Sequence, residues 1–237
     1  MSTNPPHHFT APGPATALVV AAGSGVRLGA VRAGSPVPKA LVEVGGRPLV
    51  AHAVAGLLDA GVTDVVVAVP AEHRDAFAAV LPAEVALVPG GATRTGSVRN
   101  ALARCADGAG PVLVHDAARP FTPAAVVARV LAALAAGARA VVPVLPVVDT
   151  TVEVDGDRVV AEVARAALRR VQTPQGFDRA TLVAAYAAVT DQQVFTDDAS
   201  VVRALGVPVH TVPGDELAAK ITVPHDLVLA ERHAVAR

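Results

Sequence analysis

The stretch TALVVAAGSGVR, residues 16–27, decides the fold of this 237-residue chain. Its first seven residues form a continuous apolar run, which is typical of a strand buried on both faces, and a glycine-rich turn follows directly. Glycines at the carboxyl end of a first parallel strand let the backbone approach an anion, because exposed N–H groups gather there. The stretch therefore predicts an α/β protein with an anion site at the end of its first strand.

Outward from this stretch, helical and strand-like patterns alternate along the chain. Hydrophobic spacing and Gly/Pro boundaries predict helices over residues 49–60, 71–81, 97–106, 123–136, 179–188, 199–205 and 227–235. Strands are predicted over 62–69, 85–88, 112–114, 139–144 and 207–212. Because such alternation requires right-handed crossovers, we expect a Rossmann-like, mostly parallel sheet with helices on both faces.

The alternation is interrupted between about residues 147 and 171. Residues 151–154 and 158–160 have strand character, and Asp155-Gly156-Asp157 between them predicts a hairpin turn. A two-stranded arm is only marginally stable by itself in water, so we expect it to pack on a second subunit. We further expect a disordered lead over residues 1–14 and one domain over residues 15–237, with this arm for dimerisation and no internal repeat.

Composition excludes several classes of partner. The formal net charge is −1, so the composition does not indicate a basic surface for nucleic acid or anionic lipid. We therefore expect a bound anion to be small and held by a local site. No uninterrupted apolar run approaches the roughly 20 residues of a membrane helix, and no lysine or arginine precedes residues 15–22 to make a secretion signal. The single cysteine, Cys105, is expected to be a small buried hydrophobe in a reduced, cytoplasmic compartment.

The glycine turn by itself is a weak signal. It lacks the Gly-Lys-Ser/Thr of a P-loop, and Gly29 comes one residue too late for the dinucleotide-binding fingerprint, so an ordinary tight turn is the competing interpretation. Two cations follow it, Arg27 and Lys39, and Pro38 constrains the backbone before the lysine. Fixed cations after a glycine loop favour a site for linked phosphates. The chain contains only one other lysine, Lys220.

The same residues carry a resemblance. Ala21-Ala22-Gly23-x-Gly25-x-Arg27 followed by Pro38-Lys39 resembles the signature of nucleotidyltransferases that join a nucleoside triphosphate to a sugar or polyol phosphate. Four further stretches occur in order: VHDAARP at 114–120, DT at 149–150, QTPQ at 172–175 and TDDAS at 196–200. Together they resemble the family of 2-C-methyl-D-erythritol 4-phosphate cytidylyltransferases of the non-mevalonate isoprenoid pathway, from about residue 16 onward.

The resemblance implies a role for each matched position. The nucleotide, CTP, would be bound by Ala21, Ala22, Gly23, Ser24, Gly25, Arg27, Lys39, Gly90, Gly91, Ser97 and Asp116. The phosphorylated polyol would be bound by Asp116, Arg119, Thr150, Arg165, Thr173 and Lys220. The catalytic set would be Arg27, Lys39, Arg165 and Lys220, with Mg²⁺ on Asp116. The resemblance also implies a homodimer with exchanged arms, in which Arg165 completes the partner's site.

Several positions have a simpler structural interpretation. Asp116 could cap a turn at a strand end, Arg119 could pair with Asp116, and Arg165 could be a solvated surface charge. Asp197 and Asp198 begin a predicted helix and could be N-caps, so no catalytic role is assigned to them. In the loop that reads the base in the family, Ala92 stands where a polar or acidic residue is common, which weakens the expectation of strict CTP preference.

Other activities compete with the expected one. A ribitol-5-phosphate cytidylyltransferase shares much of the motif set. A Rossmann-type dinucleotide-binding protein would carry an acidic residue at the end of the second strand, whereas that strand ends in Val69-Pro70. A nucleotide-sensing regulator without turnover would not need the full set of Arg27, Lys39, Asp116 and Lys220.

Overall fold

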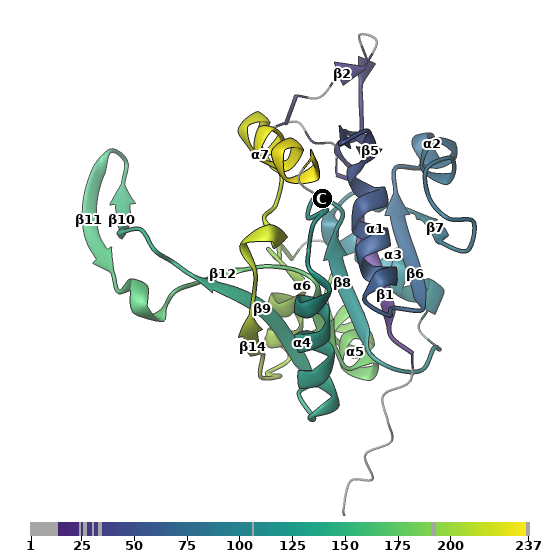
Figure 1. The fold of residues 1–237 in the computed structure, drawn as a ribbon. Helices are drawn as coiled ribbons and strands as arrows, with labels where there is room; N and C mark the ends of the chain where they lie inside the picture. The colour runs from purple at the N-terminus through teal and green to yellow at the C-terminus, as the bar shows by residue number, and fades with distance from the viewer. Residues whose placement is uncertain are drawn as a thin grey trace, which may run out of the picture.

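The computed structural model describes residues 14–23, 25, 28–29, 31–32, 35–105, 107–190 and 193–235 (Figure 1). The strands are β1 (Thr16–Val20), β2 (Val31–Arg32), β3 (Ser35–Pro36), β4 (Glu43–Val44), β5 (Arg47–Pro48), β6 (Asp64–Val69), β7 (Ala86–Pro89), β8 (Val112–Asp116), β9 (Ala140–Pro146), β10 (Thr151–Asp155), β11 (Arg158–Val163), β12 (Arg169–Val171), β13 (Gln175–Phe177) and β14 (His210–Pro213). The α-helices are α1 (Leu49–Asp59), α2 (Arg74–Ala78), α3 (Arg94–Cys105), α4 (Ala124–Ala135), α5 (Arg179–Ala188), α6 (Asp198–Ala204) and α7 (Pro224–Val235). Short 3₁₀ helices are η2 (Lys39–Leu41), η3 (Ala71–His73), η4 (Arg165–Ala167) and η5 (Glu216–Ala218).

An eight-stranded sheet forms the centre of the molecule. Its strands pair in the order β12-β9-β13-β8-β1-β6-β7, and β14 pairs with β9. β1 is parallel to both of its neighbours, β6 and β8, whereas β12 and β13 run antiparallel to β9. The chain therefore leaves β1 toward β6 and β7 and later returns to place β8 on the other side of β1. This reversal creates the crevice in which ligands bind in open α/β sheets.

Side chains of β1 alternate between two hydrophobic cores, as the period of a strand requires. Ala17 and Val19 pack on the face covered by α1, α2 and α4, and Leu18 packs on the face covered by α3, α5 and α6. The buried Cys105 belongs to the second core. Helices on both faces of a mostly parallel sheet confirm the predicted fold class.

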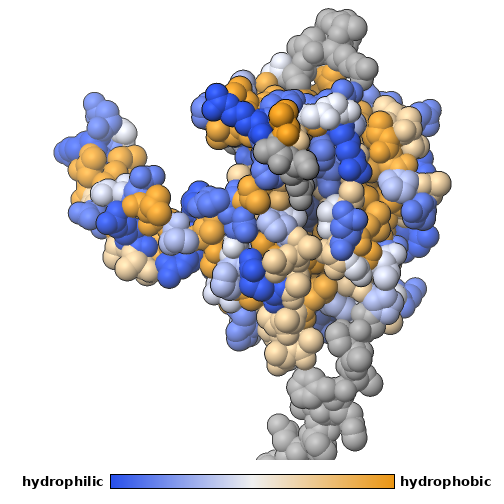
Figure 2. All heavy atoms as spheres, in the orientation of Figure 1, coloured by the Kyte–Doolittle hydropathy of each residue, from blue (hydrophilic) through white to orange (hydrophobic). Residues whose placement is uncertain are grey.

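A two-stranded arm projects away from this body (Figure 1). β10 and β11 pair antiparallel, and Gly156 with φ of +62° lies in the turn between them. Val154 and Val159 are 57% and 60% exposed, and Figure 2 shows apolar residues among hydrophilic ones along the arm. The predicted protruding hairpin is confirmed, but its base is shorter than expected, because residues 169–171 form β12 in the main sheet.

The structure also corrects several predicted elements. The helix predicted over 71–81 is only the turn η3 and the five-residue α2, and the strand predicted over 207–212 begins at His210. α3 begins at Arg94 rather than Ser97. β12 and β13 were not predicted, because a strand of three residues is too short to show a period.

A third, smaller cluster of buried residues joins the C-terminal helix to the segment after β1. Phe121 and Ile221 pack there with Val44, and Glu231 of α7 accepts a hydrogen bond from the backbone N–H of Gly45 at 2.9 Å. This packing holds α7 beside β4 and the turn that follows it. Within the described ranges, no helix is both long enough and apolar enough to cross a bilayer.

Candidate active site

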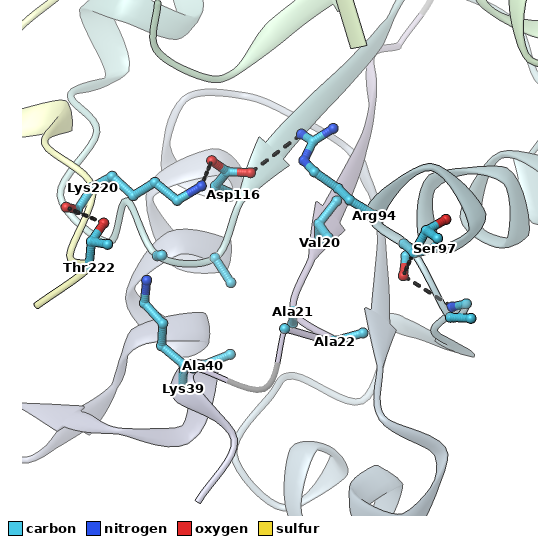
Figure 3. A pocket seen from close by; sticks show the side chains of 17 residues that line it. Val20, Ala21, Ala22, Lys39, Ala40, Arg94, Ser97, Asp116, Lys220 and Thr222 are labelled. Atoms are coloured by element: carbon cyan, nitrogen blue, oxygen red, sulfur yellow. Dashed lines mark hydrogen bonds and ion pairs between the residues drawn. The ribbon is translucent and has the colours of Figure 1, made fainter. Parts of the chain in front are cut away.

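A cavity of about 550 Å³ opens at the carboxyl ends of β1 and β8, at the point where the strand order reverses. Ala21, Ala22 and Gly23 form one wall, immediately after β1. Asp116, the last residue of β8, lies on the opposite side, and Lys39 and Lys220 reach in from separate segments (Figure 3). The topology thus brings residues that are far apart in the sequence, from Ala21 to Lys220, to the same cavity.

The glycine turn is packed tightly against η2. Gly25 has a φ of +65°, and a Cβ at this position would lie 2.5 Å from the Cβ of Lys39. A side chain at position 25 would therefore push η2 away, so the glycine fixes where Lys39 begins. Figure 3 shows the ammonium groups of Lys39 and Lys220 directed toward the same space. Two residues of the predicted set, Ser24 and Arg27, lie outside the described residues.

A second loop forms another wall and packs on the first. A Cβ at Gly90 would lie 2.3 Å from the Cβ of Ala22, so the two loops touch through the glycine. Gly91, Ala92 and Ser97 line the cavity, whereas Gly90 stands behind them. The Ser97 hydroxyl accepts a hydrogen bond from the N–H of Gly91 and donates one to the carbonyl of Thr93, both at 3.0 Å. These two hydrogen bonds of the Ser97 hydroxyl fix the conformation of the loop between Gly91 and Ser97.

Asp116 is surrounded by cations. Its Oδ2 lies 2.9 Å from Nζ of Lys220 and 3.7 Å from Nε of Arg119, and its Oδ1 lies 3.4 Å from Nη2 of Arg94. Burial acts to raise the pKa of Asp116, but the charges of Arg94, Lys220 and Arg119 together outweigh burial and hold the pKa well below its usual value. The carboxylate is therefore ionised throughout the physiological range.

Lys220 lies on a segment that is tied down on both sides. The Gln172 side chain accepts a hydrogen bond from the N–H of Asp215 at 3.0 Å and donates one to its carbonyl at 2.8 Å. Beyond the lysine, the N–H of Ile221 donates to the carbonyl of Ala118 at 2.9 Å. Because the backbone is anchored before and after Lys220, its side chain is aimed at the cavity.

Two predicted substrate-binding residues lie beneath the cavity wall. The buried guanidinium of Arg119 donates through Nη1 to the carbonyl of Ala218 at 2.7 Å, so it anchors the lysine-bearing segment and also pairs with Asp116. The buried hydroxyl of Thr173 accepts a hydrogen bond from the N–H of Asp116 at 3.0 Å. Neither residue lines the cavity, and both support Asp116 and Lys220 from behind.

Thr173 also contacts His115, the residue before Asp116. Its Oγ1 lies 2.9 Å from Nδ1 of His115, which is 1% exposed. Burial lowers the pKa of His115 to about 4, so the imidazole is neutral near pH 7. Because the Thr173 oxygen accepts from the Asp116 N–H, its own O–H is available to donate to the neutral ring nitrogen.

The remaining two predicted residues belong to the arm. Thr150 is exposed just before β10, and Arg165 is exposed in η4, where its Nη1 donates to the carbonyl of Val148 at 2.6 Å. Neither lines the cavity of its own chain. The structure thus brings together Ala21, Ala22, Gly23, Gly25, Lys39, Gly91, Ser97, Asp116 and Lys220 from the predicted set.

Sequence reasoning missed Arg94 and the role of Asp198. Arg94 lines the cavity and its Nη2 lies 2.7 Å from Oδ2 of Asp198. An N-cap was one interpretation left open for both acids. Asp197 caps α6 through the N–H of Ser200, whereas the fully buried Asp198 pairs with Arg94. Arg94 is hard to single out in the sequence, because the chain contains many arginines. The only local signal for a role in the site is its position three residues after Gly91.

A divalent cation would have one protein carboxylate here. Among the residues that the structure describes, no three His, Cys, Asp or Glu side chains are grouped as a metal site. Mg²⁺ is commonly held by one or two carboxylates together with substrate phosphates and water. The ionised Asp116, whose Oδ1 makes only a long contact with Arg94, fits that coordination provided that phosphate oxygens supply other ligands.

Comparison with known proteins gives one consistent match. The sequence profile of the 2-C-methyl-D-erythritol 4-phosphate cytidylyltransferase family matches residues 15–235. The enzyme of that name from Nocardia farcinica is 56% identical over 223 residues, which cover 92% of this chain and 93% of the relative. The enzyme from Rhodococcus opacus is 52% identical over 221 residues, covering 92% and 94%.

Solved structures agree with the sequence match. The crystal structure of 2-C-methyl-D-erythritol 4-phosphate cytidylyltransferase from Thermus thermophilus superposes with a TM-score of 0.75 at 42% sequence identity. The match covers 94% of this chain and 99% of that one. Sequence and fold therefore agree over nearly the whole described chain.

Proposed function

Because this chain belongs to the 2-C-methyl-D-erythritol 4-phosphate cytidylyltransferase family, we propose that its cavity transfers the cytidylyl group of CTP to 2-C-methyl-D-erythritol 4-phosphate. The observation that carries the proposal is the convergence of Lys39, Asp116 and Lys220 on the cavity at the ends of β1 and β8. The products are 4-diphosphocytidyl-2-C-methyl-D-erythritol and pyrophosphate, and the pathway is isoprenoid precursor synthesis.

In this reaction an oxygen of the acceptor phosphate attacks the α-phosphorus of CTP. A new P–O bond forms, the bond between the α-phosphorus and the bridging oxygen breaks, and the electron pair leaves with pyrophosphate. No protein nucleophile is required, so the protein contributes alignment of the two phosphates and stabilisation of the developing charge. The acceptor carries its own reactive oxygen, which is why no serine or cysteine nucleophile is needed in the cavity.

We assign the nucleotide to the walls formed by the two glycine loops. The backbone after β1 would approach the phosphates, and Lys39, fixed by Gly25, would neutralise the α-phosphate and the leaving pyrophosphate. The loop that begins at Gly90 would face the base through Gly91 and Ser97, which line the cavity. Because Ala92 has no polar side chain, recognition of cytosine there would fall to backbone groups.

Mg²⁺ is part of the proposal, with Asp116 as its protein ligand. When bound, it would neutralise negative charge shared between phosphate oxygens. Lys220 would bind and aim the acceptor phosphate, since its ammonium lies beside Asp116 and its segment is anchored by Gln172 and Arg119. Arg119 and Thr173 would act indirectly, by positioning Lys220 and Asp116.

The arm supports a homodimer. Its valines are exposed in the isolated chain, and a two-stranded ribbon gains stability by packing on another surface. We propose that the arms exchange between two copies, so that Thr150 and Arg165 approach the partner's acceptor site. The proposal includes a cytoplasmic location, which the single buried Cys105 permits without any disulfide.

An acceptor panel tests the reaction. Purified protein is incubated with CTP or UTP and with 2-C-methyl-D-erythritol 4-phosphate, ribitol 5-phosphate or no acceptor, while pyrophosphate release is followed. We expect release with CTP and the methylerythritol phosphate, and slower release with UTP. Preference for ribitol 5-phosphate would reassign the acceptor, and no release with any acceptor would reject the proposed function. Binding of NAD without binding of CTP would reassign the protein to dinucleotide binding.

A further inference from the structure

A buried chain of hydrogen bonds leads from the core to Arg94 at the cavity wall. The Tyr186 hydroxyl on α5 donates to Oδ1 of Asp198 at 2.6 Å, and Nη2 of Arg94 lies 2.7 Å from Oδ2 of Asp198. Asp198 is 0% exposed and Tyr186 is 3% exposed, whereas the Arg94 side chain is 27% exposed to the cavity side. Each oxygen of the buried carboxylate therefore has a partner.

The anchor of Arg94 is Asp198 rather than Asp116. The contact with Asp198 is short, while the contact of the same nitrogen with Asp116 is 3.4 Å, longer than a good N–H···O hydrogen bond. The position of the guanidinium is therefore set from the core side, independently of what Asp116 binds. In Figure 3 Arg94 extends from the start of α3 toward Asp116, on the side opposite Lys220.

A buried ion pair is a poor source of stability, because desolvation of both charges offsets their attraction. Burial acts against the charge on Arg94, but Asp198 and Asp116 together raise its pKa, so the guanidinium remains charged. Burial and the Asp198 charge also raise the pKa of Tyr186, so the phenol keeps the proton that it donates. The arrangement presents a permanently charged, fork-shaped donor to a cavity that already contains Lys39 and Lys220.

We propose that Arg94 binds the phosphates of the nucleotide and that Asp198 and Tyr186 are its positioning residues. This inference rests on the proposed function of the same cavity and adds Arg94 to its phosphate-binding cations. A guanidinium can donate two parallel hydrogen bonds to phosphate oxygens, which an ammonium cannot do. Arg94 would therefore fix the orientation of the phosphate chain, while Lys39 and Lys220 supply point charges.

The chain carries its own reporter of this network. Tyr186 is the only tyrosine and the chain has no tryptophan, so tyrosine fluorescence reports this one side chain. Addition of CTP should change the fluorescence of the wild type, because the charge of Arg94 beside Asp198 becomes shared with phosphate. The same addition should leave the fluorescence of Arg94→Met unchanged at a CTP concentration that saturates the variant in calorimetry.

Binding and turnover are measured on four variants. Arg94→Met is expected to weaken CTP binding at least tenfold by calorimetry and to lower kcat by about 100- to 1,000-fold, as for loss of one donor to a transition state. Asp198→Asn should lower kcat by about 10- to 100-fold, the usual effect of losing a positioning partner. Tyr186→Phe should have a smaller effect in the same direction.

Asp178→Asn is the matched control: it makes the same acid-to-amide change at the N-cap of α5, the helix that carries Tyr186, and should leave kcat and KM unchanged.

A double-variant cycle separates positioning from a merely structural role. If Asp198 acts through Arg94, then Asp198→Asn added to Arg94→Met should cost no further kcat, whereas two independent effects would multiply. Wild-type kcat and CTP affinity in Arg94→Met, or multiplying effects in the double variant, would overturn the inference.

Failure of the inference about Arg94 can be distinguished from failure of the proposed function. If the wild type binds CTP but releases no pyrophosphate, the reaction assignment fails and the calorimetric comparison of wild type with Arg94→Met still decides the role of Arg94. If the wild type binds no CTP, both are overturned.

Discussion

Oδ2 of Asp116 lies 2.9 Å from Nζ of Lys220, although 104 residues separate them in the sequence. The pair joins the residue that ends β8 to the segment that returns across the sheet after β14. The ammonium group of Lys220 therefore contacts Asp116, on the nucleotide side of the proposed site, and also borders the space assigned to the acceptor phosphate. Through this ion pair, the nucleotide side and the acceptor side of the proposed site are in direct contact.

Replacement of Lys39 by alanine should abolish most of the activity without unfolding the protein. Loss of one donor that stabilises a developing oxyanion costs about 3–4 kcal/mol in activation free energy, or two to three orders of magnitude in kcat. Lys39 is only half-buried at the start of η2, so its removal should leave the core intact. Pyrophosphate release and a thermal melt are compared with those of Arg232→Ala, an exposed cation on α7. Wild-type turnover in Lys39→Ala with a normal melt would contradict the assignment.

Replacement of Asp116 by asparagine should remove the effect of Mg²⁺ on nucleotide binding. In the wild type, CTP affinity measured by calorimetry should rise when Mg²⁺ is added, whereas in Asp116→Asn it should be the same with and without Mg²⁺. The variant should also be less stable by about 3 kcal/mol, because it leaves Arg94, Lys220 and Arg119 without their shared carboxylate. Asp59→Asn, an exposed acid at the end of α1, serves as the control. A Mg²⁺ effect that persists in Asp116→Asn would place the metal elsewhere.

Exchange of the arms predicts recovery of activity when two inactive variants are mixed. If Arg165 serves the partner's site, a heterodimer of Lys39→Ala and Arg165→Ala contains one site with both residues intact. Random assortment into symmetric dimers then restores about a quarter of wild-type activity. The measurement is pyrophosphate release after the two proteins have been mixed and allowed to exchange subunits, with sedimentation to establish the dimer. If Arg165 acted within its own chain, every site in the mixture would lack one residue and no activity would return.

Stability should fall as the pH drops from about 6.5 to about 4, because of His115. Its pKa in the folded protein is lowered to about 4 by burial, so between these two values the unfolded chain binds a proton that the folded chain does not. Unfolding is therefore favoured by acid in this window, by at most about 3 kcal/mol in total. Thermal melts between pH 4.5 and 7 should show the slope in the wild type and a flatter profile in His115→Asn. An equal slope in both proteins would assign the acid sensitivity to other groups.

Much of the fold follows from local patterns that survive without tertiary context. The apolar run at residues 16–22 is too regular and too well bounded by glycine to be anything but a buried strand, and β1 forms there. Residues 155–157 carry their own turn chemistry, so the hairpin of the arm was visible in the sequence. By contrast, β12 and β13 have no pattern of their own, and they become strands only because β9 and β8 offer free edges to them.

The site divides in the same way. The sequence by itself predicted the glycine loop and Lys39 as an anion site from their local spacing, and it predicted Asp116 and Lys220 through the family resemblance. Only the tertiary structure decided that Arg119 turns back to hold Ala218, that Thr173 supports Asp116 from below, and that Asp198 is an anchor for Arg94 rather than a helix cap. The reason is physical: which way a buried polar side chain points is set by the partner that satisfies its charge or hydrogen bonds. Here those partners lie from 57 to 104 residues away in the chain.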